Sequence, residues 1–146
     1  MSPKGTLFSR CIDIAAPPDR VWQLMSDVER WSEWTASVRS IRRLDKGPLA
    51  IGSRAWVRQP RLLPGVWTVT ALEPERSFTW TTGVPGLFAA EGSHAIEVLG
   101  EVCRVTLSLR FRGVLGAMMA RILKNTNNRY LALEADGLKL RSESGR

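Results

Sequence analysis

The sequence predicts an α+β fold in which a strongly curved antiparallel sheet of seven strands packs around one long helix at the C-terminal end. Three observations predict it. Strand-like segments follow one another with short connections, which is typical of antiparallel neighbours. The last of these segments alternates strictly between apolar and polar residues. The pattern then changes to a helical period, which continues almost to the end of the chain.

The first strand is predicted over residues 6–14. It ends at Pro17-Pro18-Asp19, where proline and an acidic residue favour the start of a helix. Apolar residues at helical spacing from Val21 to Val28 continue that helix, and a second short helix is predicted around Glu29–Trp34. Further strands follow, each closed by a glycine or a proline. They are predicted over residues 38–44, 53–59, 66–72, 77–82 and 90–99.

The final strand, residues 102–112, has the clearest pattern. Its apolar residues, from Cys103 to Phe111, alternate with polar and cationic residues from Arg104 to Arg112. We therefore expect one face on the core and the other in water. From Val114 to Arg141 apolar residues recur every three or four positions. At ~1.5 Å per residue this helix would be about 40 Å long, enough to cross the sheet and cover its apolar face.

Length and composition favour one domain. The chain has 146 residues, of which 44% are hydrophobic and 24% are charged. We expect a single core over residues 5–141 and a polar tail over residues 142–146. No apolar run reaches ~18 residues, so no transmembrane segment is expected. No apolar signal segment follows Met1, so the expected location is the cytoplasm.

Motifs for cofactors are missing from the sequence. Cys11 and Cys103 are the only cysteines and His94 is the only histidine, which is too few for a zinc site. Neither GxGxxG nor GxxxxGK[ST] occurs, so we expect no nucleotide cofactor and no metal. The formal net charge of +7 raises the question of nucleic acid. Because the basic residues are spread along the chain without a run, we expect a solvated basic surface instead.

Three stretches of the sequence stand out: the run from Ile12 to Trp22, the segment from Val28 to Trp34 and the hairpin-like stretch from Trp67 to Trp80. Together they resemble the START-like (SRPBCC) superfamily. Within that superfamily the chain is most similar to the bacterial polyketide cyclase/dehydratase-like branch, over about residues 6–141. The resemblance implies the helix-grip fold, in which a curved sheet grips the last helix around a hydrophobic cavity. It implies no particular activity, because members bind or transform very different ligands.

The expected cavity directs attention to aromatic and flexible apolar side chains. Aromatic walls suit flat or hydrophobic ligands, and methionine adapts to irregular ones. Each of these side chains could equally be part of a packed core. The candidate ligand-binding residues are Trp31, Trp34, Trp56, Trp67, Trp80, Phe88, Met118, Met119, Ile122 and Thr126.

His94 is the first candidate for a catalytic residue. It shares a strand face with Ile96 and Val98, so we expect it to point inward, where it could act as an acid or a base. Tyr130 lies on the predicted inner stripe of the long helix and could offer a hydroxyl to the same ligand. A structural role is the alternative for both residues: a histidine hydrogen-bonded at a strand start, and a hydroxyl bonded from helix to sheet.

Three functions are open at this point. The first is the binding of a small hydrophobic molecule, of lipid, polyketide or isoprenoid type, between sheet and helix. The second is a polyketide cyclase or dehydratase that positions its substrate in the same cavity, with His94 and Tyr130 moving protons. The third is a partner of an acidic protein, RNA or a lipid surface, which would use the basic sheet face of Arg104, Arg110 and Arg112.

Overall fold

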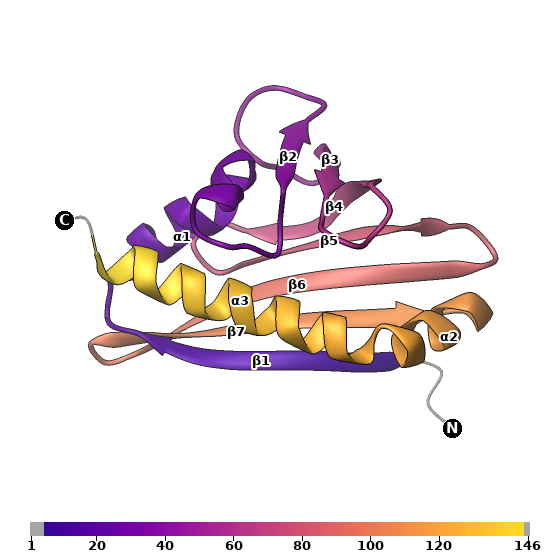
Figure 1. The fold of residues 1–146 in the computed structure, drawn as a ribbon. Coiled ribbons are helices and arrows are strands. Elements are labelled where there is room, and N and C mark those ends of the chain that lie inside the picture. Colours follow the sequence, from indigo (N-terminus) through magenta and orange to yellow (C-terminus); the bar gives the residue numbers. More distant parts are fainter. Residues whose placement is uncertain (1–4, 145–146) are drawn as a thin grey trace.

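The computed structural model describes residues 5–144 of the chain. Within these residues, helices and strands form a curved sheet with a helical layer on its concave side (Figure 1). The strands are β1 (Thr6–Ile14), β2 (Ser40–Arg43), β3 (Arg54–Arg58), β4 (Gly65–Glu73), β5 (Ser77–Val84), β6 (Phe88–Leu99) and β7 (Val102–Arg112). The helices are α1 (Pro18–Ser26), the 3₁₀ helix η1 (Val28–Glu33), α2 (Val114–Ile122) and α3 (Lys124–Glu143).

The strands form one antiparallel sheet in the order β1-β7-β6-β5-β4-β3-β2. From β2 to β7 each strand pairs with its neighbour in the chain, as the short connections predict. β1 pairs instead with β7, where Ile14 lies opposite Cys103. Figure 1 shows α3 lying lengthwise over β1 and β7, while β2 and β3 turn up beside it. The predicted architecture, a curved seven-stranded sheet around a C-terminal helix, is confirmed.

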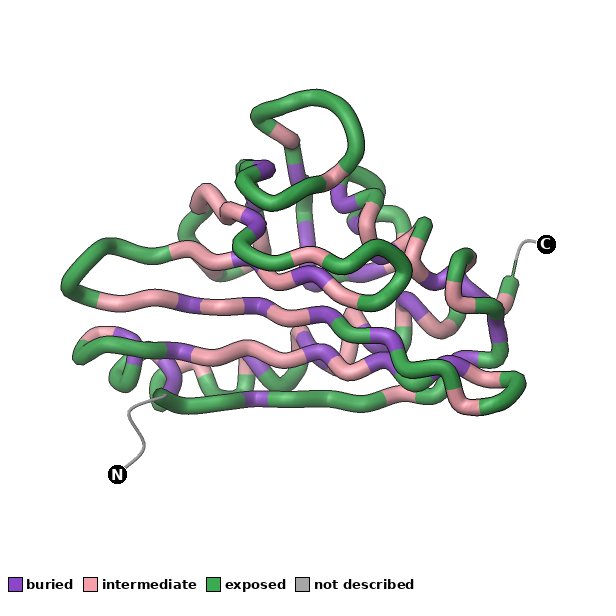
Figure 2. The backbone as a smooth tube through the Cα atoms, turned by 180° about the vertical axis from the view of Figure 1, so that it is seen from behind, coloured by how far each residue is buried: buried purple, intermediate pink, exposed green. Residues whose placement is uncertain are grey.

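The two faces of the sheet differ as the alternation of the last strand predicts. Along β7, Cys103, Val105 and Leu107 are buried on the concave side, whereas Arg104 is exposed. Figure 2 shows the outer face, where no helix covers the strands and exposed stretches predominate at the edges. The strand boundaries differ from the predicted ones by at most two residues; β6, for example, begins at Phe88 and not at Ala90.

The C-terminal helical region is interrupted, whereas a single helix was predicted over residues 114–141. α2 ends at Ile122, and Leu123 takes φ −97° and ψ 16° before α3 begins. The Leu123 amide still donates to the Met119 carbonyl at 2.8 Å, so the chain bends with that hydrogen bond kept. None of the helices in residues 5–144 is long and apolar enough to cross a membrane.

The buried positions of α2 and α3 lie one residue after the predicted stripe. Gly116 and Ala120 face the core, where Leu115 and Met119 were expected. A Cβ placed on Gly116 would lie 3.5 Å from the backbone of Phe111, so α2 packs close to β7 through its smallest residues. Of the larger apolar side chains of α2, Val114, Met118 and Ile122 are exposed, and Leu115 and Met119 are half-buried.

α3 also passes close to the end of η1. A Cβ at Gly137 would lie 1.9 Å from the carbonyl oxygen of Trp34, so a side chain cannot be accommodated there without moving the backbone. On the same helix Ala135 and Leu138 are buried against the sheet. The small residue thus sets the distance between α3 and the segment that carries Trp34.

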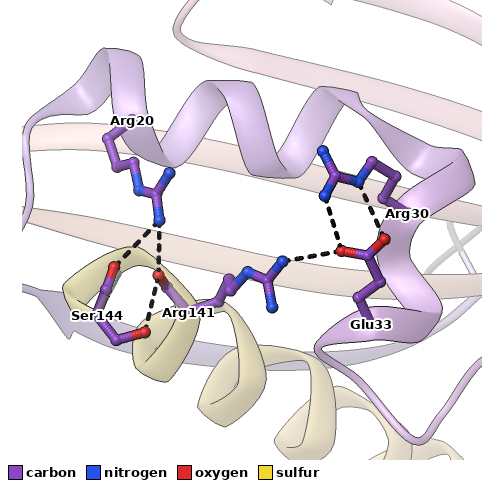
Figure 3. Close-up of polar contacts among 5 residues, drawn as sticks. All are labelled: Arg20, Arg30, Glu33, Arg141 and Ser144. Atoms are coloured by element: carbon purple, nitrogen blue, oxygen red, sulfur yellow. Dashed lines mark hydrogen bonds and ion pairs between the residues drawn. The ribbon is translucent and has the colours of Figure 1, made fainter. Parts of the chain in front are cut away.

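The C-terminal end of α3 is fastened to the N-terminal helices by arginines (Figure 3). Nη2 of Arg20 donates to the carbonyls of Arg141 and Ser144 at 3.1 and 3.2 Å, which satisfies acceptors that the end of a helix leaves free. Arg141 donates to Glu33 at 2.8 Å, and Glu33 also accepts two hydrogen bonds from Arg30. We call this set the arginine latch.

The polar tail expected over residues 142–146 begins later than predicted. α3 continues to Glu143, and Ser142 is fully buried. The latch explains the difference, because it holds the last turn of α3 against α1 and η1. Gly145 and Arg146 of that tail, like residues 1–4 at the other end, lie outside the described residues.

Candidate functional site

A cavity of about 780 Å³ lies between the concave face of the sheet and helices α2 and α3. Strands β2 to β7 supply one wall, the helices supply the opposite wall, and η1 contributes Trp31. Residues 61–64, in the loop between β3 and β4, also line it. Leu63 in that loop is 93% exposed, so the cavity opens to solvent there. The volume lies within the ~300–1,000 Å³ that is usual for small-molecule sites.

Three tryptophans form an aromatic wall of the cavity. The ring centroid of Trp80 lies 5.5 Å from that of Trp31 and 5.7 Å from that of Trp67. Trp80 is paired across the sheet with Gly92, and a Cβ at Gly92 would lie 3.3 Å from the Trp80 ring. The missing side chain therefore leaves room for the indole against β6. The result is a broad apolar surface on which a flat ligand can stack.

The ligand-binding candidates divide evenly between the cavity and other places. Trp31, Trp67, Trp80, Phe88 and Met119 line the cavity. Trp34, Trp56, Met118, Ile122 and Thr126 are not among its lining residues. Contact of the first group with a ligand stays a prediction, while the second group needs a physical reason for its position.

Alternation and helix phase account for four of these misplaced candidates. Ala55 and Val57 of β3 are buried, which leaves Trp56 between them on the outer face, 36% exposed. Met118 and Ile122 lie on the exposed side of α2, at 49% and 73% exposure, because Gly116 and Ala120 take the inward positions. Thr126 is next to the inward position and not on it, since the buried stripe runs one residue later than predicted.

Trp34 lines a different and polar hollow. This hollow, of about 310 Å³, lies at the arginine latch and is bordered by Arg20, Arg30 and Arg141. The indole Nε1 of Trp34 is buried there without a hydrogen-bond partner among the described residues. Three residues make one turn of a 3₁₀ helix, so the spacing of Trp31 and Trp34 predicts that they share one face. Trp34 lies one residue beyond the end of η1, however, and therefore does not follow this helical spacing.

His94 points inward, as the alternation of β6 predicts, and is only 5% exposed. Its ring stacks on Phe78 with 4.3 Å between the centroids. Nδ1 lies 3.2 Å from the Phe78 carbonyl oxygen, which favours the neutral tautomer that is protonated on Nδ1. Burial lowers the pKa of His94 to about 4, although the Phe78 carbonyl opposes that shift. At neutral pH the His94 ring is therefore uncharged, and its Nε2 is a hydrogen-bond acceptor. His94 is one of the residues that line the cavity.

Tyr130 lines the cavity from α3, and its hydroxyl donates a hydrogen bond to the carbonyl of Pro60. This contact joins the helix to the β3–β4 loop at the cavity opening. The hydroxyl therefore has a structural hydrogen bond, as the alternative to a catalytic role predicts, but its partner is the β3–β4 loop and not the sheet. A catalytic role for Tyr130 stays a proposal.

Two further polar residues of the cavity were not among the candidates. Asn127 is 3% exposed, and its Nδ2 has no hydrogen-bond partner among the described residues. Glu134 is half-buried, lines the same cavity, and accepts a hydrogen bond from the Ser37 hydroxyl at 3.4 Å. Burial raises the pKa of Glu134 to about 7, with the Ser37 bond opposing the shift. The spacing of seven residues, two helical turns, is the signal that could have found this pair.

The charged groups on the outer face of the sheet are weaker candidates for a functional site than the residues of the cavity. Arg104, on the outer face of β7, donates to both carboxylate oxygens of Asp13 at 2.8 and 3.3 Å, and Arg112 lies 3.6 Å from Glu91. These cations of the basic sheet face thus have acidic neighbours. Within residues 5–144, no group of three or more histidine, cysteine or acidic side chains is arranged to hold a metal ion.

Comparison with known proteins agrees with this architecture. The sequence model of the family described as polyketide cyclase/dehydrase and lipid transport matches residues 6–143. A comparison with curated proteins finds no match. Among solved structures, the fold is similar to that of hypothetical protein jhp0584 from Helicobacter pylori. The TM-score is 0.82 at 15% identity, with 95% of this chain and 89% of that one covered.

Two further structures carry more specific descriptions. A START superfamily protein from Mycobacterium smegmatis matches with a TM-score of 0.70 at 18% identity, over 95% of this chain and 98% of that one. The di-domain ARO/CYC protein BexL from the BE-7585A biosynthetic pathway matches with 0.69 at 19% identity, over 95% of this chain and 48% of BexL. At these identities the likeness shows the fold alone. The family match spans nearly the whole chain; the fold is the START-like (SRPBCC) one, and the protein belongs to the polyketide cyclase/dehydrase and lipid transport family.

Proposed function

We propose that the protein binds one small hydrophobic molecule, of lipid, polyketide or isoprenoid type, in the cavity between the sheet and α3. The observation that carries this proposal is a predominantly apolar cavity of about 780 Å³ with a wall of Trp31, Trp67 and Trp80. Apolar ligand surface removed from water contributes ~25 cal/mol per Å². A cavity that exists before the ligand arrives also reduces the entropy lost on binding.

The ligand carries a hydrogen-bond acceptor on the side that faces α3. The support is the buried Nδ2 of Asn127, which has no hydrogen-bond partner within residues 5–144, in a lining that is otherwise mostly apolar. Leaving a buried donor without a partner costs ~1–3 kcal/mol, and a ligand carbonyl or ether oxygen placed there removes that cost. A polyketide or an oxygenated isoprenoid fits this requirement better than a plain hydrocarbon.

Two probes that differ by one oxygen atom test both statements. 2-Acetylnaphthalene and 2-ethylnaphthalene have nearly the same shape, but only the first has a carbonyl. In ¹H–¹⁵N NMR titrations we expect both to shift the indole signals of Trp31, Trp67 and Trp80. Asn127→Leu should weaken the ketone relative to the hydrocarbon by about tenfold. If neither probe shifts the indoles, the hydrophobic site is contradicted; if the ratio is unchanged in the variant, only the polar contact is contradicted.

Acid–base catalysis of cyclase or dehydratase type is the second candidate function. The observation that favours it is the presence, in one cavity, of a carboxyl whose pKa is raised to about 7 and a neutral imidazole. A group that titrates near the working pH can both take and give a proton. Glu134 and His94 would move the proton of an enolisable ketone, and Tyr130 would need to release the Pro60 carbonyl to take part.

Deuterium exchange tests this second function without the natural substrate. In D₂O the methyl protons of 2-acetylnaphthalene exchange through its enol, and NMR follows the loss of their signal. We expect the protein to accelerate the exchange, and Glu134→Gln and His94→Phe each to reduce the acceleration. If the probe binds but its exchange is no faster than in buffer, the catalytic function is contradicted and only ligand binding is left.

A partner function through the basic sheet face has weaker support, because Arg104 is paired with Asp13.

The cytoplasmic location also stays a prediction, and fractionation of cells that express the tagged chain tests it.

A further inference from the structure

Large apolar side chains are exposed on α2, on the β5–β6 hairpin and on the β3–β4 loop. On α2, Val114, Met118 and Ile122 follow one another at intervals of four residues and are 83%, 49% and 73% exposed. Residues at this spacing form one stripe along a helix. The β3–β4 loop and the β5–β6 hairpin add three more residues. We call the whole set the apolar rim: Leu63, Val84, Leu87, Val114, Met118 and Ile122.

The segments of the apolar rim meet at one end of the sheet. Val84 pairs with Phe88 at the tip of the β5–β6 hairpin, and the Leu115 amide of α2 donates to the Leu87 carbonyl at 3.2 Å. Figure 1 shows α2 and this hairpin at the same end of the molecule. Leu63 and Val84 also line the cavity, whereas Met118 lines a separate hollow between α2 and β1 together with Arg121 and Lys124. The loop side of the rim therefore borders the cavity, and the α2 side continues the apolar surface beyond it.

Acidic residues are scarce in the segments at this end, so the net positive charge of the chain comes mostly from them. The segments 58–65, 84–91 and 110–133 form the end of β3 with the loop after it, the β5–β6 hairpin, and the region from the end of β7 into α3. Together they contain seven Lys/Arg and one acidic residue, Glu91, whereas the rest of the chain has fourteen Lys/Arg and thirteen Asp/Glu. Six of the seven units of net positive charge therefore lie in these segments.

Several of these cations have no acidic partner. Arg61, Arg121 and Lys124 are exposed, and none of them forms an ion pair within the described part of the chain. Arg61 lies two residues from Leu63, and Arg121 is next to Ile122, so charged and apolar side chains are interleaved. An exposed apolar surface bordered by such cations is typical of a site that contacts a bilayer or another macromolecule.

We propose that this end of the molecule docks on an anionic lipid bilayer, with the apolar rim among the lipid headgroups and the surrounding arginines and lysine against the lipid anions. A bilayer surface meets both requirements, since it takes apolar side chains and attracts basic ones. RNA would use the charges but gains nothing from an exposed Ile122 or Leu63. A second copy of the chain would bring two positively charged ends together, which is unfavourable.

Docking in this orientation places the cavity opening against the bilayer. A hydrophobic ligand could then pass between membrane and cavity without crossing water. This consequence rests on the proposed function, whereas the docking itself does not, because the apolar rim and its charges are present whatever the cavity holds.

Sedimentation with lipid vesicles tests the proposal. The protein is mixed with vesicles of phosphatidylcholine alone, or of equimolar phosphatidylcholine and phosphatidylserine, at low and at high salt. The test variants are Ile122→Ser and the double variant Arg121→Gln/Lys124→Gln. The matched controls are Leu140→Ser, which removes an apolar side chain with the same 73% exposure from the distant part of α3, and Arg76→Gln in the β4–β5 turn at the other end of the sheet.

We expect binding to the phosphatidylserine vesicles only, weakened strongly by salt, and a loss of about tenfold in partition for each test variant. The controls should bind as the unmodified chain does. Equal partition to both kinds of vesicle, no partition, or equal losses in the controls would overturn the proposal. A loss in the charge variant with none in Ile122→Ser would also overturn it, since that result describes a purely electrostatic partner such as RNA.

Titration of Ile122→Ser with 2-acetylnaphthalene separates this proposal from the proposed function. We expect the indole shifts to remain in the variant, which shows that the cavity is intact while docking is reduced. Vesicle binding by a protein whose indoles never respond to either naphthalene would support the docking surface and contradict the hydrophobic ligand site.

Discussion

Glu134→Gln is expected to change how the stability of the protein depends on pH. Glutamine has the shape of a protonated glutamic acid, so the substitution removes the titration and keeps the contacts. In the folded protein burial raises the pKa of Glu134 from 4.5 to about 7. The folded state therefore holds a proton that the unfolded state releases between these pH values, and stability falls as pH rises through this window.

The magnitude follows from the shift. At 1.36 kcal/mol per pKa unit, a rise from 4.5 to about 7 lowers the free energy of unfolding by about 3 kcal/mol once pH exceeds 7. The variant should thus equal the unmodified protein near pH 4.5 and exceed it by about 3 kcal/mol at pH 8. His94 acts in the opposite direction, since its lowered pKa removes stability as pH falls from 6.5 through 4. That contribution is present in both proteins and cancels in the difference.

Urea denaturation of the two proteins at several pH values measures this difference. Glu101→Gln, in the exposed turn between β6 and β7, controls for the loss of one carboxylate. A difference between Glu134→Gln and the unmodified chain that is the same at pH 4.5 and pH 8 would contradict a raised pKa for Glu134. It would mean that water reaches the carboxyl in the folded state as freely as in the unfolded one.

Further predictions concern α2, α3 and their contacts. Gly137→Ala should destabilise the protein by about 3 kcal/mol, because the Cβ would meet the Trp34 carbonyl, whereas Gly116→Ala meets only ordinary contacts and should stabilise it by about 0.5–1 kcal/mol; urea denaturation compares the two. Asn127→Leu should raise the free energy of unfolding by about 1 kcal/mol, since it removes an unpaired buried amide, and a decrease would show that the amide has a partner such as water. Arg20→Met should speed amide hydrogen exchange in the last turn of α3 by about tenfold, while unchanged exchange would show that the arginine latch does not hold that turn.

The fold could be predicted from the sequence because its signals are local. Strict alternation in β7 identifies the buried face, and short connections between strands dictate antiparallel pairing. The interruption at Leu123 could not be predicted in this way. The helical period continues across it, and no glycine or proline marks the position. In the structure the interruption separates α2, which packs on β7 at Gly116, from α3.

The candidate site was less predictable, because it depends on helix phase and on where polar atoms find partners. His94 was placed correctly, since alternation on a strand needs only the neighbouring residues. Thr126 and Asn127 differ by 100° on a helix, and the stripe of large apolar residues indicated the wrong one of the two. Glu134 resembles a surface residue in the sequence. Its raised pKa arises from the cavity wall and from Ser37, which lies far away in the chain.

The polar residues of the cavity lower the stability of the fold, and this has a consequence for binding. An ionised Glu134 above pH 7, and an Asn127 whose Nδ2 has no partner in the described part of the chain, are both less favourable than apolar residues of the same size would be. The fold does not need them to hold α3, because Leu131, Ala135 and Leu138 already bury that helix against the sheet. A ligand that offers an acceptor to Asn127 supplies the hydrogen-bond partner that its Nδ2 lacks among the described residues. The same ligand displaces water from around Glu134 and raises its pKa further, so binding should take up a proton near pH 7 and weaken as pH rises above it.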